Sequence, residues 1–263
     1  MVNAKGLSYL GAIAALALGT ISATPAHATL QLTSVNNGAN LFCADQSACD
    51  TDPAVGSLLL APGTLSGNVQ INGSLSTASL ASATLNSTSF SVINLNHTAV
   101  DLFVAVGATG FFGPRQTYSF AGSGTFQNAI GGRITDTWYD DPTDAQPATT
   151  TSGPLVPGDK PGNELSGGGM THVATQISDA FAFNSGGVQD LAVPDTGDFS
   201  MTLGFFIHLP GSPTSCSLAR TATCAQLVGR SNTLVKFEVP EPASLGLLGA
   251  GLVAVGLLRR KRA

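Results

Sequence analysis

Charged residues are scarce in this chain of 263 residues. They make up 10% of the sequence, and glutamate occurs only three times, at Glu164, Glu238 and Glu241. Surface helices are normally rich in lysine, glutamate, alanine and leucine, so this shortage argues against a helical body. Serine, threonine, asparagine, valine and phenylalanine are abundant instead, together with 31 glycines. The composition therefore favours β-structure.

The common motifs of catalysis are missing too. The chain has no Gly-x-Ser-x-Gly nucleophile turn, no His-Glu-x-x-His metal motif and no phosphate-binding P-loop. With so few glutamates, a glycosidase would have to draw its carboxylate pair mainly from aspartates. The histidines His97, His172 and His208 fall in separate expected strands at polar-facing positions, as surface histidines do. We therefore expect no catalytic residue, no metal site and no enzyme activity.

Alternation of apolar and polar residues predicts the strands. The clearest case is the stretch 198–210, which has an apolar residue at every second position from Phe199 to Leu209. Weaker runs lie around 69–71, 90–95, 118–126 and 134–139. Three further stretches predict these inward faces: Val100, Leu102, Val104 and Val106; Val173 and Ile177; and Val235, Phe237 and Val239. Many short strands separated by turn residues predict an all-β fold, an antiparallel β-sandwich or jelly roll.

One stretch breaks this pattern. Residues 140–169 hold five of the 14 prolines and show no apolar periodicity over these thirty positions. Such a length without structure is unusual in a compact domain, so the stretch is either a long surface loop or a linker between two sheets. We favour the loop, because the chain after it is too short for a core of its own. The expected body is then one β-sandwich domain over residues 29–238.

The first 28 residues have the three parts of a secretory signal peptide. Lys5 is an early cation, an apolar stretch runs from Leu7 to about Ile21, and Ala26-His27-Ala28 has the small-x-small pattern that signal peptidase accepts. We therefore expect residues 1–28 to direct export and to be removed after Ala28.

The C-terminus combines a proline-containing motif, an apolar run and a basic tail. Val239-Pro240-Glu241-Pro242 precedes sixteen uncharged residues, 243–258, which would span about 24 Å as a helix. We expect this run to cross a membrane, with the cations after it on the cytoplasmic side. Those cations are Arg259, Arg260, Lys261 and Arg262.

These three parts, in this order, resemble the PEP-CTERM sorting signal, and Pro240, Glu241 and Pro242 carry the motif. The resemblance covers residues 239–263 and nothing of the body. It implies that the chain is a substrate of an exosortase, a membrane-embedded, cysteine transpeptidase-like enzyme of Gram-negative bacteria. It also implies export across the inner membrane, transient anchoring there, and a final place at the cell surface or outside the cell. A link to exopolysaccharide or biofilm production comes with the same resemblance.

Removing both end signals makes the chain strongly acidic. From Thr29 to Pro242 there are six basic and sixteen acidic residues, a formal charge of −10. Such a chain repels phosphate backbones, so we expect no nucleic-acid partner. Calcium is a candidate ligand of the aspartates, either beside Asp50 and Asp52 or in the region from Asp140 to Asp144. No EF-hand pattern is present, and turn-forming aspartates are the simpler interpretation.

The four cysteines fit an oxidising compartment. Cys43 and Cys49 lie six positions apart, and Cys216 and Cys224 lie eight apart. We expect a disulfide within each pair, although four cysteines allow three connectivities. Zinc ligation is the competing interpretation, but the spacings are wider than usual and neither pair has a histidine beside it.

These patterns predict an exported, exosortase-processed surface or matrix protein without catalytic activity. One alternative is a carbohydrate-binding sandwich, for which the adjacent aromatics Trp138 and Tyr139 would have to be exposed; packing of Trp138 in the core is the simpler expectation. A second alternative is a secreted hydrolase that combines aspartates with a histidine. The expected partners are signal peptidase, the exosortase and the inner membrane before processing, with exopolysaccharide as a further candidate.

Overall fold

The structure, a computed structural model, describes residues 30–36, 39–61, 63–72, 75–80, 82–141, 144, 164–165 and 170–237. All strand pairs in these ranges are antiparallel. The helical structure within the same ranges is one 3-10 turn at Thr221–Thr223. The prediction of an all-β fold with antiparallel sheets is confirmed.

The strands form two sheets. The seven-stranded sheet has the order β11 (Glu164–Leu165), β10 (Arg133–Asp141), β15 (Phe199–Leu209), β8 (Val100–Phe111), β1 (Leu30–Asn36) and β2 (Ala39–Ala44), and β12 (Met170–Val173) also pairs with β10. The nine-stranded sheet has the order β13 (Ser178–Asn184), β9 (Arg115–Gln127), β16 (Ala225–Phe237), β7 (Thr84–Asn94), β5 (Val69–Asn72) and β4 (Thr64–Ser66). In that second sheet, β14 (Gln189–Asp195) pairs with β9, β6 (Leu75–Ser79) pairs with β7, and β3 (Ser57–Leu59) pairs with β6.

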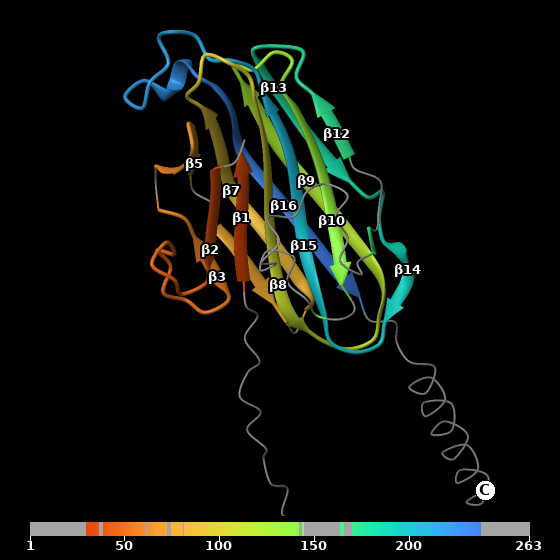
Figure 1. Cartoon of the computed structure of the whole chain (residues 1–263). Helices are drawn as coiled ribbons and strands as arrows, with labels where there is room; N and C mark the ends of the chain where they lie inside the picture. Colours follow the sequence, from red (N-terminus) through yellow and green to blue (C-terminus); the bar gives the residue numbers. More distant parts are fainter. Residues whose placement is uncertain are drawn as a thin grey trace, which may run out of the picture.

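The two sheets lie face to face, with the seven-stranded sheet in front in Figure 1. One cluster of buried apolar side chains, from Leu30 to Leu234, fills the space between them. Phe90 of β7 and Phe205 of β15 meet across the two sheets, with ring centroids 6.3 Å apart. Burial of such large aromatic side chains is a dominant source of stability in this kind of core.

The strongest alternation patterns are confirmed. In β15, the apolar residues at every second position from Phe199 to Leu209 are all fully buried. In β8, the same holds for the face that contains Leu102, Val104 and Val106. Successive side chains of a strand point to opposite faces, so this pattern can bury one whole face of each strand.

The prediction of an inward face at Val173 and Ile177 is wrong. β12 ends at Val173 and β13 begins at Ser178, so the two residues do not share a strand. Both side chains are exposed, at 48% and 64%. The connection between the strands is fixed instead by backbone hydrogen bonds from Asn128 to Ile177 and from Ala174 to Gly132.

The predicted face of the last strand is also wrong. In β16, Leu234 and Lys236 point into the core, while Phe237 points outward and is 37% exposed. The cause is a bulge between Val228 and Ser231 that shifts the register against β9. Within it, Gly229 has a φ of +61°, which glycine adopts at little cost. The extra residue moves the inward face from odd to even positions.

The segment predicted as a loop, 140–169, starts later than expected. β10 continues through Asp140 to Asp141, and Asp140 pairs with Glu164 of β11. Apart from Asp144 and the two residues of β11, the remainder lies outside the described residues. The expected domain boundaries therefore stay a prediction.

Both ends of the described body lie at the same end of the sheets (Figure 1). Leu30, the first residue of β1, pairs with Ala108, and Ala108 pairs with Met201, which pairs with Asp140. The side chain of Lys236, next to the last described residue, contacts the same Asp140. We call this end the terminal end and the opposite one the apical end.

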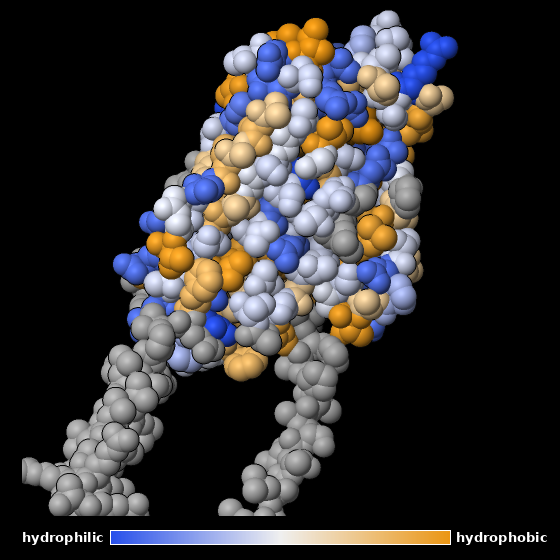
Figure 2. Space-filling model, turned by 180° about the vertical axis from the view of Figure 1, so that it is seen from behind, coloured by the Kyte–Doolittle hydropathy of each residue, from blue (hydrophilic) through white to orange (hydrophobic). Residues whose placement is uncertain are grey.

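The outer face of the nine-stranded sheet is mostly hydrophilic or neutral, with scattered apolar residues (Figure 2). Residues with hydroxyl or amide side chains account for this surface, because they occupy the outward positions of β7, β9 and β16. Examples are Asn86, Ser119, Ser123, Ser231 and Thr233. This face carries little charge.

Candidate functional site

Strand β16 carries two cations into the core. Arg230 and Lys236 are 0% and 1% exposed, although such residues are rarely buried without a partner. The Nη2 atom of Arg230 lies 3.3 Å from Oδ1 of Asp136, and Asn232 donates a 3.1 Å hydrogen bond to Oδ2 of the same carboxylate. Lys236 pairs with Asp140. Both carboxylates come from β10, so the ion pairs join the two sheets from inside.

Aromatic rings enclose these charges. The guanidinium carbon of Arg230 lies 3.2 Å from the ring centroid of Phe205, and Nζ of Lys236 lies 4.4 Å from that of Phe199. Burial raises the pKa of Asp136, and the positive charge of Arg230 acts in the opposite direction and limits this rise. Burial lowers the pKa of Arg230 to about 10, although the negative charge of Asp136 acts to raise it. The cations are therefore core components, held by partners and by cation–π contacts.

The space around Asp136 is closed. Gly122 of β9 makes room for the network, because a Cβ at this position would lie 2.4 Å from Oδ1 of Asn232 and 2.8 Å from Oδ2 of Asp136. A cavity of about 20 Å³ beside Asp136 and Trp138 has room for about one water molecule. No substrate of ordinary size fits there, so Asp136 does not face an external ligand.

Both predicted disulfides are present. The first disulfide joins Cys43 of β2 to Cys49 in the connection after that strand, and the second joins Cys216 to Cys224 in the connection between β15 and β16. All four cysteines are used, so the zinc interpretation does not apply to them. The pairs that lie close in sequence are the pairs that form.

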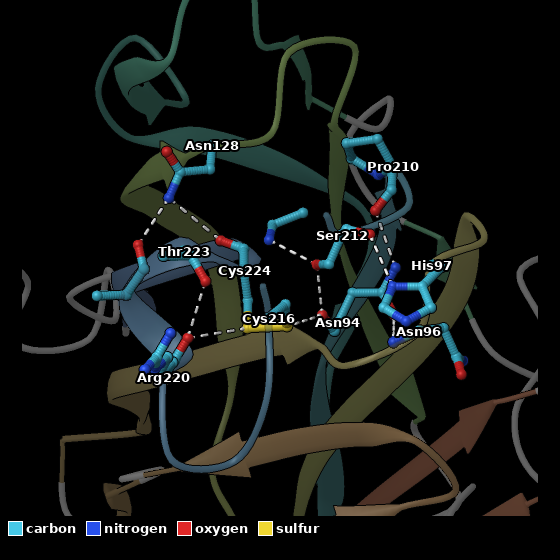
Figure 3. Close-up of a disulfide and its surroundings, with 12 residues drawn as sticks. Asn94, Asn96, His97, Asn128, Pro210, Ser212, Cys216, Arg220, Thr223 and Cys224 are labelled. Atoms are coloured by element: carbon cyan, nitrogen blue, oxygen red, sulfur yellow. Dashed lines mark hydrogen bonds between the residues drawn. A yellow bond between two sulfur atoms is a disulfide. The ribbon is translucent and has the colours of Figure 1, made fainter. Parts of the chain in front are cut away.

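The Cys216–Cys224 loop is fastened to the apical end by side-chain hydrogen bonds (Figure 3). Ser212 donates to the carbonyl oxygen of Asn94 at 2.6 Å and accepts from the backbone N–H of Ala225 at 2.7 Å. Asn94 donates to the carbonyl oxygen of Pro210 at 2.8 Å. Asn128, from the turn after β9, donates to the carbonyl oxygen of Ala222 at 2.8 Å. These hydrogen bonds and the disulfide therefore fix the loop to this end of the body.

The aspartates near the first disulfide hold the backbone of their own loop. Asp50 accepts hydrogen bonds from the backbone N–H groups of Gln46, Asp52 and Leu59. Asp52 accepts from the hydroxyl of Ser57 and from the N–H of Ala54, which lower its pKa. These are the turn-forming roles that the sequence favoured over calcium ligation.

The three histidines predicted to lie in strands occupy three different environments. His97 lies in the connection between β7 and β8, so its assignment to a strand is wrong, and its Nδ1 lies 3.1 Å from the carbonyl oxygen of Ser212. His172 points inward from β12, stacks on Phe181 and lies 3.2 Å from Asp179. Only His208 lies on an outer strand face. Within the described ranges, no three His, Cys, Asp or Glu side chains gather to hold a metal ion.

A group of carboxylates lies at the terminal end. Asp144 accepts a 2.8 Å hydrogen bond from the N–H of Gly110, and burial raises its pKa, with further contributions from the charges of Asp198 and Asp141. Asp140, which the calcium hypothesis included, already pairs with Lys236.

The adjacent aromatics of β10 are buried on opposite faces of the sheet. Trp138 is 2% exposed in the core, where its ring centroid lies 4.4 Å from that of Tyr118. Tyr139 is 1% exposed and packs with Phe103 and Ala105 on the other face. The core position of Trp138 was expected, and the pair does not form an exposed aromatic surface for a sugar.

The outer face of the seven-stranded sheet holds a groove that no sequence pattern predicts. It has a volume of about 310 Å³ and is lined by Gly131, Arg133, Val173 and His208. The strand register places Arg133 between Val173 and His208, and it pairs His208 with Asp101. The four residues Val173, Arg133, His208 and Asp101 thus form one row across four strands. No local pattern brings them together, because each comes from a different strand.

The sorting motif and the predicted membrane span lie outside the described residues. Within the described ranges, no helix is long and apolar enough to cross a membrane. The motif is confirmed by comparison, since residues 238–262 match the family model of the PEP-CTERM protein-sorting motif. No curated protein sequence matches the chain.

One solved structure that resembles the chain is the isomalto-dextranase of Arthrobacter globiformis T6 complexed with panose. The two are 14% identical, with a TM-score of 0.26, and the match covers 79% of this chain and 30% of that enzyme. A likeness at this level carries no argument about fold or function.

Proposed function

Because residues 238–262 carry a PEP-CTERM sorting motif, we propose that the protein is an exosortase substrate of a Gram-negative bacterium. Its N-terminal segment directs export, and its C-terminal segment holds it in the inner membrane until an exosortase cuts beside Pro240-Glu241-Pro242. The released body then serves at the cell surface or in the extracellular matrix, in association with exopolysaccharide, and it has no catalytic activity of its own.

The position of the motif directly after the folded body carries this proposal. β16 ends at Phe237, and the matched motif begins at residue 238. Three residues on, Pro240 can lie no more than about 10 Å from the end of β16 even in a fully extended chain. The two prolines lack a backbone N–H and cannot extend the strand pairing of β16. A segment with these two prolines suits a membrane enzyme that must grip an extended, unpaired substrate.

The polar groups of the body support a role without catalysis. Asp136 and Asp140 are paired with Arg230 and Lys236 inside the core. Neither carboxylate is available to an external substrate, and the histidines named for the hydrolase alternative lie in three separate environments. The two β-sheets and two disulfides give instead a stable, acidic body, as suits a protein that must persist outside the cell.

Replacing Pro240-Glu241-Pro242 by three alanines tests the proposal in the native host. The variant should accumulate as an uncut, membrane-bound precursor, detected by immunoblotting of membrane and released fractions. The matched control replaces Pro213-Thr214-Ser215, an exposed proline-containing triplet in the apical loop, and should be processed like the parent. If the motif variant is trimmed and released as efficiently as the control, the proposal is wrong.

A further inference from the structure

We propose that the outer-face groove at Arg133 binds a carboxylate-bearing glycan. This inference goes beyond the sorting of the protein and holds whether or not the motif is cut. Its starting point is a local exception to the negative charge of the body. Arg230 and Lys236 are buried in ion pairs and Arg115 is 4% exposed, so Arg133 and Arg220 are the exposed cations of the described residues.

Arg133 is positioned but not neutralised. It is exposed, and its guanidinium lies over the ring of Phe206, 5.7 Å from the centroid. In the part of the chain that the structure describes, no hydrogen bond or ion pair engages this guanidinium. A planar guanidinium matches a carboxylate with two parallel hydrogen bonds, which makes it the preferred side chain for that group.

The residues around Arg133 suit the hydroxyl groups of a sugar. His208 is held by Asp101, with Nδ1 2.8 Å from Oδ1, and the Asp101 side chain is 56% exposed. The next row across the sheet contains Thr171, Thr135 and Phe206, and the two threonine hydroxyls lie 2.9 Å apart. Adjacent strands lie about 4.8 Å apart, so the three polar residues of the first row, Arg133, His208 and Asp101, span roughly 10 Å, about the length of two sugar units.

A peptide is a poorer match to this groove. Peptides commonly bind sheets by adding a strand at a free edge. Arg133 is in the interior of the sheet, because β10 pairs with β12 on one side and with β15 on the other at this position. The contacts that the groove offers are therefore side chains of the outer sheet face, among which Val173 is an exposed apolar one.

Titration calorimetry of the full-length chain with hexagalacturonate tests the inference. We expect binding that Arg133→Gln weakens by about tenfold or more, the loss of one charge-assisted contact. Arg220→Gln, the other exposed arginine, should change the affinity less than about twofold. Thr135→Val should weaken binding by a smaller factor. An unchanged melting temperature would show that each variant is folded.

Four results would overturn the inference. The first is no binding of hexagalacturonate, and the second is binding that Arg133→Gln leaves unchanged. The third is equal binding of neutral maltohexaose, which would remove the role of the carboxylate. Hexaglutamate serves as the acidic peptide, and if it binds as tightly with the same dependence on Arg133, the site takes acidic chains in general and the glycan assignment fails.

Discussion

Removing the positive charge of Arg230 should destabilise the body strongly at neutral pH. Arg230→Met keeps an unbranched apolar side chain against Phe205 but leaves Asp136 in the core with Asn232 as its remaining partner. Asp136 is 1% exposed, so water cannot replace the lost cation. Breaking a buried ion pair by removing one partner typically costs about 3–5 kcal/mol of unfolding free energy. We expect a loss in that range.

The paired replacement should recover most of this loss. In Arg230→Met/Asp136→Leu, no charge remains in the core at this position, and apolar replacements of buried ion pairs are often neutral or stabilising. The coupling between the two sites then appears as a strongly non-additive double-mutant cycle. Arg220→Met, at an exposed position of the apical loop, is the control and should change stability by less than about 0.5 kcal/mol.

Urea denaturation with the disulfides intact measures these effects without changing ionic strength. Trp138, the only tryptophan, is buried in the core near Asp136 and reports its unfolding by fluorescence. If Arg230→Met costs less than about 1 kcal/mol, or if the double variant is as unstable as the two single losses added together, the ion pair does not act as described.

The pH dependence gives an independent check with a defined sign. The pKa of Asp136 is already raised by burial, and removal of Arg230 takes away the main charge that opposes this rise. The native state then binds more protons than the unfolded state at pH values above the ordinary pKa of about 4, so stability falls as pH rises through that window. The penalty of Arg230→Met should therefore be largest at neutral pH and should shrink on acidification. A penalty that grows at low pH would contradict this account.

Two further outcomes are expected. Lys236→Met should speed amide hydrogen exchange at the end of β16, at Val235 and Phe237, because the buried contact with Asp140 anchors that end; unchanged exchange there would show that strand pairing alone holds it. Peptide mapping of exported protein without reduction should find Cys43 linked to Cys49 and Cys216 linked to Cys224, and Cys43→Ser/Cys49→Ser should cost about 2–3 kcal/mol; four alkylatable thiols in that material would refute the pairing.

What the sequence predicted correctly was local. The alternation in β15 and β8 identifies buried faces, because every second residue of a strand shares a face. The short cysteine spacings give the disulfides, and the sorting motif is contained in about 25 neighbouring residues. In each case the residues that define the feature lie within one short stretch, so no knowledge of the chain path is needed.

The misassigned features depend on partners far away in the sequence. The inward face of β16 changes at the bulge around Gly229, and that bulge is defined by pairing with β9. Arg230 and Asp136 are 94 positions apart, so no local sequence pattern predicts that either side chain is buried. The row through Arg133 needs the register of four strands at once. A cation in a strand is predicted to face solvent as long as its partner in the fold is not known.

The order of the strands connects folding to sorting in the proposed pathway. β16 is last in the chain but lies in the interior of its sheet, between β9 and β7. It also supplies Arg230 and Lys236, the cations that pair with Asp136 and Asp140 inside the core. An exported chain that emerges from its N-terminus delivers this strand last, so the sheet and its ion pairs cannot be completed before Phe237 has crossed the membrane. The next residues to arrive are those of the sorting motif. Completion of the body and presentation of Pro240-Glu241-Pro242 to a membrane enzyme therefore fall at the same stage of export.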